Sequence, residues 1–149
     1  MIPRYTSPAM GRIWSEPRRY ETWLEVEIAA AEAMAEAGVI PADAAREIRE
    51  KGAFDVARIE AIEAETRHDV IAFTTAVAER VGEAARWLHF GLTSSDIIDT
   101  AQAIQMREAC DVIVGDLQAL AAAIRMRAEE YRHTPMIGRT HGVHAEPIT

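Results

Sequence analysis

The sequence predicts an all-α fold, and three observations support this prediction. The 149 residues are 49% hydrophobic and include only 8 Gly and 6 Pro, a composition typical of an ordered, mostly helical chain. Apolar residues recur at intervals of three and four in several segments, which is the helical period. The stretch from Asp96 to Tyr131 contains no proline and a single glycine, Gly115. At the α-helical rise it would form one helix of about 50 Å.

Composition also excludes several classes of function. The net charge of -8 argues against a nucleic-acid-binding surface, although a small anionic ligand needs only a local basic pocket. The single cysteine, Cys110, cannot form an internal disulfide, which fits a reducing cytoplasm. There is no signal peptide and no apolar run long enough to cross a bilayer. We therefore expect a cytoplasmic protein with neither a nucleic-acid nor a membrane partner.

The elements follow in order from their boundary residues. Met1 to Gly11 is expected to be a non-helical lead broken by prolines, in which Arg4 and Tyr5 offer a cation beside a phenol that could hold a phosphate or carboxylate. Ser15 begins a helix that ends at Gly38. Two shorter helices follow, one from Pro41 to near Gly52 and one capped by Asp55. Their apolar faces predict that these helices form the hydrophobic core and carry no functional residues.

Arg67, His68 and Asp69 precede the next apolar helix. Asp69 is well placed to be its N-cap, and capping alone could explain the triplet. The alternative is that Arg67, His68 and the free backbone N–H groups of the helix N-terminus bind an anion. The residues themselves leave these two interpretations equally open.

A run of hydroxyl side chains, Thr93, Ser94 and Ser95, stands at the start of the long helix, a few residues after His89. One hydroxyl suffices to cap a helix, so the others are spare hydrogen-bond donors for a carboxylate ligand. The helix itself is longer than the roughly 30 Å diameter expected of a compact chain of this length. Its second apolar flank therefore needs other helices, from further sequence or from other subunits.

The segment from Gly138 to Pro147 is poorly suited to a helix because of its glycines and proline. It holds His141 and His144 on what we expect to be a tight loop, where an imidazole with a pKa of about 6.5 could exchange a proton with a ligand. Taken alone, these are more often ordinary surface histidines. Pro147 looks like the start of another helix, so we interpret the chain as the N-terminal part of a larger protein.

Four segments in this order resemble the adenylosuccinate lyase family: RYTSPAMGRIW, RHDVIAF, FGLTSSDIIDT and GRTHGVHAEP. The last two are shared more loosely with the wider fumarase/aspartase superfamily. The resemblance covers the whole chain and implies an L-aspartase/fumarase-like fold. Residues 1–92 would then form an N-terminal helical domain, and residues 93–149 the start of a central helical-bundle domain.

The resemblance implies a lyase of purine biosynthesis that releases fumarate from adenylosuccinate to give AMP, and from SAICAR to give AICAR. His141 matches the general acid/base histidine, and His68 matches a second active-site histidine. The remaining matches are to substrate-binding positions: Arg4, Tyr5, Arg67 and Asp69 for the nucleotide, Thr93 and Ser94 for the succinyl group, and His89 and Thr140. We expect no metal and no cofactor.

The same resemblance implies a homotetramer with active sites shared between subunits. The family's flexible loop with its catalytic serine has no counterpart here, so the base should lie outside this sequence and the chain alone should be inactive. One long helix of about 50 Å separates Thr93 from the segment 134–141, which reaches only about 26 Å when extended. We therefore predict that His68 and His141 of one chain lie more than about 15 Å apart.

Two alternatives remain at this stage. The first is another lyase of the superfamily, of the carboxymuconate-cycloisomerase or argininosuccinate lyase type. The second is a helical interaction module without chemistry, in which the polar motifs are only caps and turns. Substrate assays separate the first from adenylosuccinate lyase, and an anion bound near Arg67 and Thr93 would count against the second.

Overall fold

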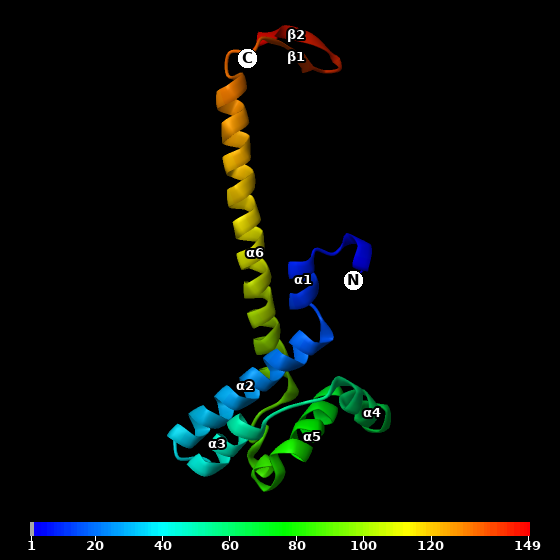
Figure 1. Cartoon of the computed structure of the whole chain (residues 1–149), viewed down its shortest axis with the longest axis vertical. Coiled ribbons are helices and arrows are strands. Elements are labelled where there is room, and N and C mark those ends of the chain that lie inside the picture. Colours follow the sequence, from blue (N-terminus) through cyan, green and yellow to red (C-terminus); the bar gives the residue numbers. More distant parts are fainter. Residues whose placement is uncertain (1) are drawn as a thin grey trace. The chain divides into compact units, whose positions relative to one another are not determined.

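The computed structural model describes residues 2–149, apart from the side chain of Pro3, and the fold is helical except for one short hairpin (Figure 1). The all-α prediction is thereby confirmed. The chain divides into two compact units, Met1–Ala109 and Cys110–Thr149. The expected domain boundary between residues 92 and 93 stays a prediction.

The N-terminal lead is helical, so the expectation of a non-helical segment is wrong. A 3-10 turn, η1 (Pro3–Tyr5), is followed by a short helix, α1 (Pro8–Ile13). The Ser7 hydroxyl accepts the backbone N–H of Met10 at 3.3 Å and caps α1. Pro8 then occupies the first turn, where the missing N–H of proline costs nothing and its fixed φ suits a helix. Proline here begins a helix rather than breaking one.

The next three helices begin where the sequence predicts, and α2 ends two residues before the expected Gly38. Helix α2 (Glu16–Glu36) is capped by Ser15, whose hydroxyl accepts the Arg18 N–H at 3.3 Å. Helix α3 (Ala42–Lys51) follows Pro41. Helix α4 (Val56–Thr66) is capped by Asp55, whose carboxylate accepts the Arg58 N–H at 2.9 Å. Each cap satisfies a backbone donor that the first helical turn cannot satisfy internally.

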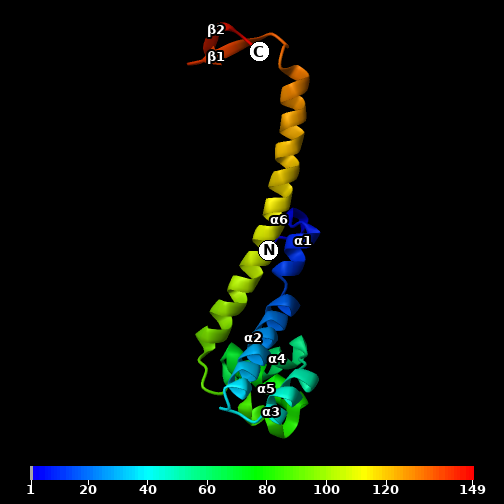
Figure 2. The ribbon, with the colours of Figure 1, turned by 90° about the vertical axis from the view of Figure 1, so that its left-hand side faces the viewer.

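Helix α5 (Asp69–Val81) and the 3-10 segment η2 (Gly82–Trp87) complete the core of the first unit. Helices α3, α4 and α5 gather beside α2, as a second view also shows (Figure 2). Four aromatic rings form the centre. Phe73 stacks on Tyr20 at a centroid distance of 5.7 Å and meets Trp23 edge-on at 5.4 Å, with Phe54 at 6.2 Å. Phe73 is completely buried, so this cluster is the main apolar anchor of the fold.

The long helix α6 (Ser94–Tyr131) is unbroken, as predicted. Within the first unit it buries one face, at Ile97, Ala101, Gln105 and Ala109, which are four residues apart. The Gln105 amide donates to the backbone carbonyl of Ile13 at 2.7 Å. These contacts fix the first four turns of α6 against the helices that hold the candidate site.

From Cys110 onward, α6 residues are exposed except for the half-buried Val112. The exposed residues of this part include large apolar side chains, namely Ile113, Val114, Leu117, Leu120, Ile124, Met126 and Tyr131. Apolar surface in this amount is typical of a helix that packs against partners. Within residues 2–149, no helix is long and apolar enough to span a membrane.

A β-hairpin follows α6, made of β1 (Met136–Thr140) and β2 (Val143–Ile148). The strands are antiparallel, and Thr140 pairs with Val143 across a two-residue turn. Gly138 lies at a register shift, where an added Cβ would come within 3.0 Å of the Glu146 carbonyl oxygen. The extended segment was expected, but its pairing was not. Pro147 lies in β2 opposite Ile137 rather than at the start of a helix, which corrects that expectation.

Candidate functional site

The junction between α4 and α5 holds the first group of predicted site residues. Arg67 ends α4 in the left-handed conformation, with φ 56° and ψ 28°. Its backbone N–H donates to the Glu63 carbonyl at 2.8 Å, which closes the helix. The guanidinium makes no hydrogen bond or ion pair with any residue in the range 2–149 and is exposed. It is therefore available to an anion.

His68, rather than Asp69, is the N-cap of α5, which corrects the expected cap. The His68 Nδ1 atom accepts the backbone N–H of Ile71 at 3.3 Å. A nitrogen that accepts a hydrogen bond carries no proton, so the neutral ring holds its proton on Nε2. Asp69 is the first residue of the helix, and its carboxylate accepts the neighbouring Val70 N–H at 2.8 Å. The cap thus fixes both the orientation and the tautomer of His68.

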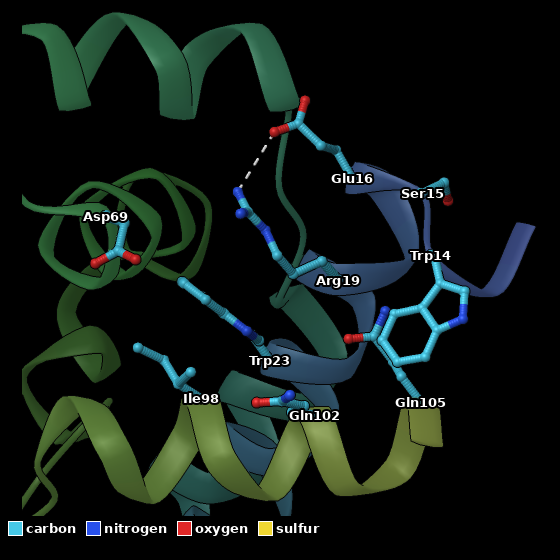
Figure 3. A pocket seen from close by; sticks show the side chains of 9 residues that line it. All are labelled: Trp14, Ser15, Glu16, Arg19, Trp23, Asp69, Ile98, Gln102 and Gln105. Atoms are coloured by element: carbon cyan, nitrogen blue, oxygen red, sulfur yellow. Dashed lines mark hydrogen bonds and ion pairs between the residues drawn. The ribbon is translucent and has the colours of Figure 1, made fainter. Parts of the chain in front are cut away.

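Asp69 also lines a pocket of about 330 Å³ in the first unit (Figure 3). Ile98 and Gln102 of α6 border the same space, so the first turns of α5 and α6 share one hollow. Arg67, His68 and Thr93 do not line it. The full lining consists of Trp14, Ser15, Glu16, Arg19, Trp23, Asp69, Ile98, Gln102 and Gln105.

Arg19 is the cation of this pocket, and sequence reasoning missed it. Its guanidinium carbon lies 4.5 Å from the centre of the Tyr20 ring and 5.5 Å from that of Trp23. One Nη atom donates to the Tyr20 hydroxyl at 2.6 Å. The buried Nε has no hydrogen-bond partner in the described part of the chain. An arginine on an amphipathic helix gives no sequence signal, because only the packing of α5 and α6 shows that it lines a hollow.

His89 binds a buried carboxylate that the sequence analysis did not identify. Its ring Nδ1 lies 2.5 Å from one oxygen of Glu27, and its backbone N–H donates to the other oxygen at 3.0 Å. Glu27, in the middle of α2, is only 1% exposed. Burial raises the pKa of the Glu27 carboxyl, against the two hydrogen bonds from His89, which lower it.

This raised pKa predicts a pH-dependent contribution to stability. A carboxyl whose pKa is raised on folding stabilises the protein fully below its ordinary pKa and loses that contribution as the pH rises through the folded value. We therefore expect the free energy of unfolding of the wild type, relative to Glu27→Gln, to fall as the pH rises from below the ordinary carboxyl pKa through the raised pKa of folded Glu27. Urea denaturation at several pH values measures this difference.

Glu32→Gln is the matched control for that experiment. Glu32 lies on the same helix, and its hydrogen bond from Arg49 lowers the pKa of its carboxyl. The free energy of unfolding of the wild type, relative to Glu32→Gln, should therefore rise with pH. The change should be small because the Glu32–Arg49 pair is exposed. If the difference in unfolding free energy between the wild type and Glu27→Gln did not change with pH, the prediction would be contradicted.

Thr93 and Ser94 stand at the N-terminus of α6. The Thr93 backbone N–H donates to the Asp96 carboxylate at 2.8 Å. The side chain that accepts a backbone N–H at the start of α6 is therefore a carboxylate rather than a hydroxyl. The hydroxyls of Thr93, Ser94 and Ser95 make no hydrogen bond to any residue that the structure describes. These hydroxyls are therefore free of polar partners among the described residues, and their role toward a ligand stays a prediction.

Arg4 and Tyr5 are exposed in η1, with the guanidinium carbon 4.8 Å from the centre of the Tyr5 ring. This stacking holds the arginine beside the phenol, as the sequence suggested. No described residue forms an ion pair with Arg4. The contact keeps a cation and a hydroxyl together near the N-terminus.

The hairpin of the second unit positions His141 and Thr140. His141 and Gly142 form the two-residue turn, with φ values of 49° and 75°. Positive φ at both central positions is the signature of a type I′ hairpin turn. Thr140 is the last residue of β1, and His144 in β2 lies opposite Arg139, 3.3 Å between Nε2 and the guanidinium. His141 is thus presented at the exposed tip of the hairpin.

One backbone feature is shared by these scattered residues. Among residues 2–149, the non-glycine residues with positive φ are Arg67, His89 and His141, at 56°, 58° and 49°. This conformation costs a residue with a Cβ roughly 1–2 kcal/mol. Such strain collects at functional sites, where the surrounding structure sustains it. All three residues are among the candidate site residues that the sequence predicts.

Arg67, His68, Asp69, His89, Thr93 and Ser94 belong to the first unit, whereas Thr140 and His141 belong to the second. Within the first unit, no hydrogen bond or ion pair among the described residues links the Arg67–Asp69 group to His89 or Thr93. The separation of His68 from His141 stays a prediction.

Comparisons with known proteins agree with these features. The sequence profile of a family described as "Lyase" matches residues 4–149. The chain is 55% identical to an adenylosuccinate lyase of Synechocystis sp. and 50% identical to one of Bacillus subtilis, over all 149 residues in both cases. The resemblance found in the sequence motifs is confirmed. The chain spans 35% of the length of these relatives.

Solved structures give the same fold. A fumarate lyase from Mesorhizobium sp. BNC1 superposes with a TM-score of 0.88 at 32% identity, covering 93% of this chain and 33% of that one. A 3-carboxy-cis,cis-muconate lactonizing enzyme from Pseudomonas putida superposes with a TM-score of 0.86 at 34% identity, covering 96% of this chain and 34% of that one. The helical arrangement is therefore common to a fumarate lyase and a muconate lactonizing enzyme.

Proposed function

The chain belongs to the lyase family, and from this premise we propose that it supplies part of the active site of an adenylosuccinate lyase. The complete enzyme releases fumarate from adenylosuccinate to give AMP and from SAICAR to give AICAR. The observation that supports this choice most is the identity of 50–55% over the whole chain to relatives named adenylosuccinate lyase. The muconate-type structure is 34% identical, which favours the purine nucleotide substrate.

The chemistry fits the residue types. In the proposed β-elimination, a base removes the proton from the carbon next to a succinyl carboxylate, the bond from carbon to the purine-side nitrogen breaks, and that nitrogen receives a proton. His141 at the hairpin tip is the proposed proton donor. His68, with Nε2 as its outward donor, helps hold the succinyl and phosphate groups. The base comes from outside this sequence.

Cations and hydroxyls hold the anionic ends of the substrate in this proposal. Arg4 with Tyr5 and Arg67 with Asp69 contact the nucleotide, and Thr93 and Ser94 contact the succinyl group, with His89 and Thr140 as further contacts. The support lies in the availability of these groups. The guanidinium groups of Arg4 and Arg67 and the hydroxyls of Thr93 and Ser94 have no polar partner among the described residues. Hydrogen bonds to charged ligand groups are stronger than hydrogen bonds between neutral groups.

A substrate assay of the complete protein that contains this chain tests the proposal. Purified protein would be given adenylosuccinate, SAICAR, argininosuccinate and 3-carboxymuconate in parallel, and fumarate or lactone formation would be followed. We expect turnover of the two succinylated purine precursors. Turnover of one of the other substrates alone would assign the chain to a different lyase, and no turnover of any would favour a non-catalytic module. The 149-residue chain alone should be inactive, because an active site that lacks its catalytic base loses orders of magnitude in rate.

Single substitutions of the proposed anion-binding residues should weaken substrate binding. Arg4→Ala, Arg67→Gly and Thr93→Ala each remove a contact to an anionic group, worth about 1.5–3 kcal/mol, or roughly 10- to 150-fold in Kd. Glycine is chosen at position 67 because it adopts the φ of 56° without strain. Calorimetric titration of the complete enzyme with AMP measures the Kd of the Arg4 and Arg67 variants. For the Thr93 variant, the Kd of adenylosuccinate is measured in a His141→Asn background, which prevents turnover. Arg46→Ala, whose arginine pairs only with Asp43 on the surface of α3, is the control.

The proposed enzyme is a homotetramer with active sites built from several subunits. The exposed apolar residues of α6 beyond Cys110 support an assembly, because such a surface is unfavourable in water. If His68 and His141 of one site come from different chains, hybrids of two inactive variants should regain activity. We expect mixed His68→Ala and His141→Asn proteins, denatured and refolded together, to recover a substantial fraction of wild-type activity. Continued inactivity after verified mixing would show that each site is built from one chain.

A further inference from the structure

The contact between Glu27 and His89 is the most unusual polar feature of the first unit. Glu27 lies in the interior of α2 and is 1% exposed. Placing a carboxylate in a protein interior costs several kcal/mol unless hydrogen bonds compensate for the lost water. Its only compensation among the described residues comes from a single partner, His89, 62 positions away in the sequence. An apolar residue at this buried position would avoid the cost of desolvating a carboxylate, so the presence of Glu27 needs an explanation.

Both carboxylate oxygens of Glu27 bond to the same residue, His89. One accepts the backbone N–H of His89 at 3.0 Å, and the other faces the ring Nδ1 at 2.5 Å. The backbone bond holds His89 in its strained conformation, with φ 58°. The ring bond fixes the side-chain torsions. Glu27 therefore determines where the imidazole points as well as which nitrogen is engaged.

The second ring nitrogen is left for a ligand. The His89 side chain is 24% exposed, and its Nε2 has no hydrogen-bond partner within residues 2–149. An ionised carboxylate only accepts hydrogen bonds, so a ring nitrogen 2.5 Å from the Glu27 oxygen is its donor and carries the proton on Nδ1. A carboxylate that accepts the Nδ1 proton of a histidine fixes its tautomer and orientation, as in catalytic triads and metal sites. Nε2 then accepts a hydrogen bond from a ligand in the neutral ring and donates one to an anion in the charged ring.

We infer that Glu27 is a positioning residue: it holds His89 in the Nδ1-protonated form, with Nε2 directed at the ligand. This inference rests on the proposed function for the identity of that ligand, in which His89 contacts an anionic group of a succinylated purine nucleotide. The arrangement of Glu27 and His89 is independent of that identity. Glu27 itself is buried and acts through the imidazole.

The first test is spectroscopic and needs no activity. The ring ¹⁵N shifts of His89 in the 149-residue chain, recorded at a pH where the ring is neutral, distinguish a protonated Nδ1 from a protonated Nε2. We expect a protonated Nδ1 in the wild type, against the usual preference of free histidine for Nε2. Glu27→Gln should shift the ring toward the Nε2-protonated form, and Glu27→Asp, which keeps the carboxylate, should retain part of the wild-type signal. Glu32→Gln, on the same helix but paired with Arg49, should leave His89 unchanged.

The second test uses the complete enzyme and a double-mutant cycle. Glu27→Gln should raise KM for adenylosuccinate several-fold more than it lowers kcat, and it should add no further effect in a His89→Ala background. Additive losses would show that Glu27 acts on structure alone and would overturn the inference. A wild-type His89 protonated on Nε2 would overturn it too, and that measurement requires no variant to fold. If the complete protein turned over no succinylated nucleotide, the proposed function would fail, while the ¹⁵N result would still decide the role of Glu27.

Discussion

Replacing His141 in the complete enzyme is expected to reduce kcat by roughly 10²–10⁴-fold while changing the substrate Kd little. The physical reason is that a proton donor acts mainly in the transition state, when charge develops on the departing nitrogen. His141 has the position for this role, because the hairpin turn presents its ring at an exposed tip. Steady-state and single-turnover kinetics with adenylosuccinate, together with a direct binding measurement, separate the two effects.

The strained backbone at position 141 requires a second variant. Alanine at a φ of 49° carries the same penalty as histidine, whereas asparagine adopts this conformation readily and cannot transfer a proton near neutral pH. Both His141→Ala and His141→Asn should lose turnover to the same extent. His133→Ala, an exposed histidine outside the hairpin, is the control and should keep wild-type kinetics. Near-normal turnover in the asparagine variant would remove His141 from the catalytic role.

Replacing Phe73 with alanine is expected to lower the free energy of unfolding by about 3–5 kcal/mol. Phe73 is completely buried and contacts three aromatic rings, those of Tyr20, Trp23 and Phe54. Truncation removes its transfer free energy and leaves a cavity that the two rings on α2 and the ring of Phe54, in the loop before α4, cannot fill without moving. Urea denaturation of the 149-residue chain, followed by circular dichroism, measures the change.

Ile71→Ala is the matched control for the core variant. Ile71 lies on the same helix, two residues earlier, but is 49% exposed. Its replacement should change stability by less than about 1 kcal/mol, since most of its surface stays in water and alanine favours the helix. Similar losses in the two variants would mean that the aromatic cluster does not anchor the fold.

Helix boundaries could be predicted from the sequence wherever a cap is a local event. Ser15 and Asp55 each reach a backbone N–H three residues ahead, so the residue type and its position suffice. The same local logic failed in two places. Pro8 begins a helix rather than breaking one, because proline suits a first turn, and α5 is capped by the His68 Nδ1 atom rather than by the expected Asp69.

The hairpin illustrates a different failure. Glycines and a proline around His141 excluded a helix, but they did not show that Met136–Thr140 would pair with Val143–Ile148. His141-Gly142 is not among the common dipeptides of a two-residue turn, so the strongest hairpin signal was absent. The pairing depends on cross-strand contacts, which a segment does not reveal by itself.

The sequence by itself determined the helical class and the unbroken helix from Ser94 to Tyr131, because periodicity and caps are properties of neighbours along the chain. The candidate site residues stay predictions that rest on the resemblance of four motifs. Only the tertiary structure decided that Arg19 lines a pocket with Asp69, that Glu27 bonds to His89, and that Arg67, His89 and His141 share a backbone with positive φ. The first two bring together residues 50 and 62 positions apart, and a sequence pattern does not encode which distant helices pack together. The third is a strain that each residue tolerates only because its surroundings hold it in place.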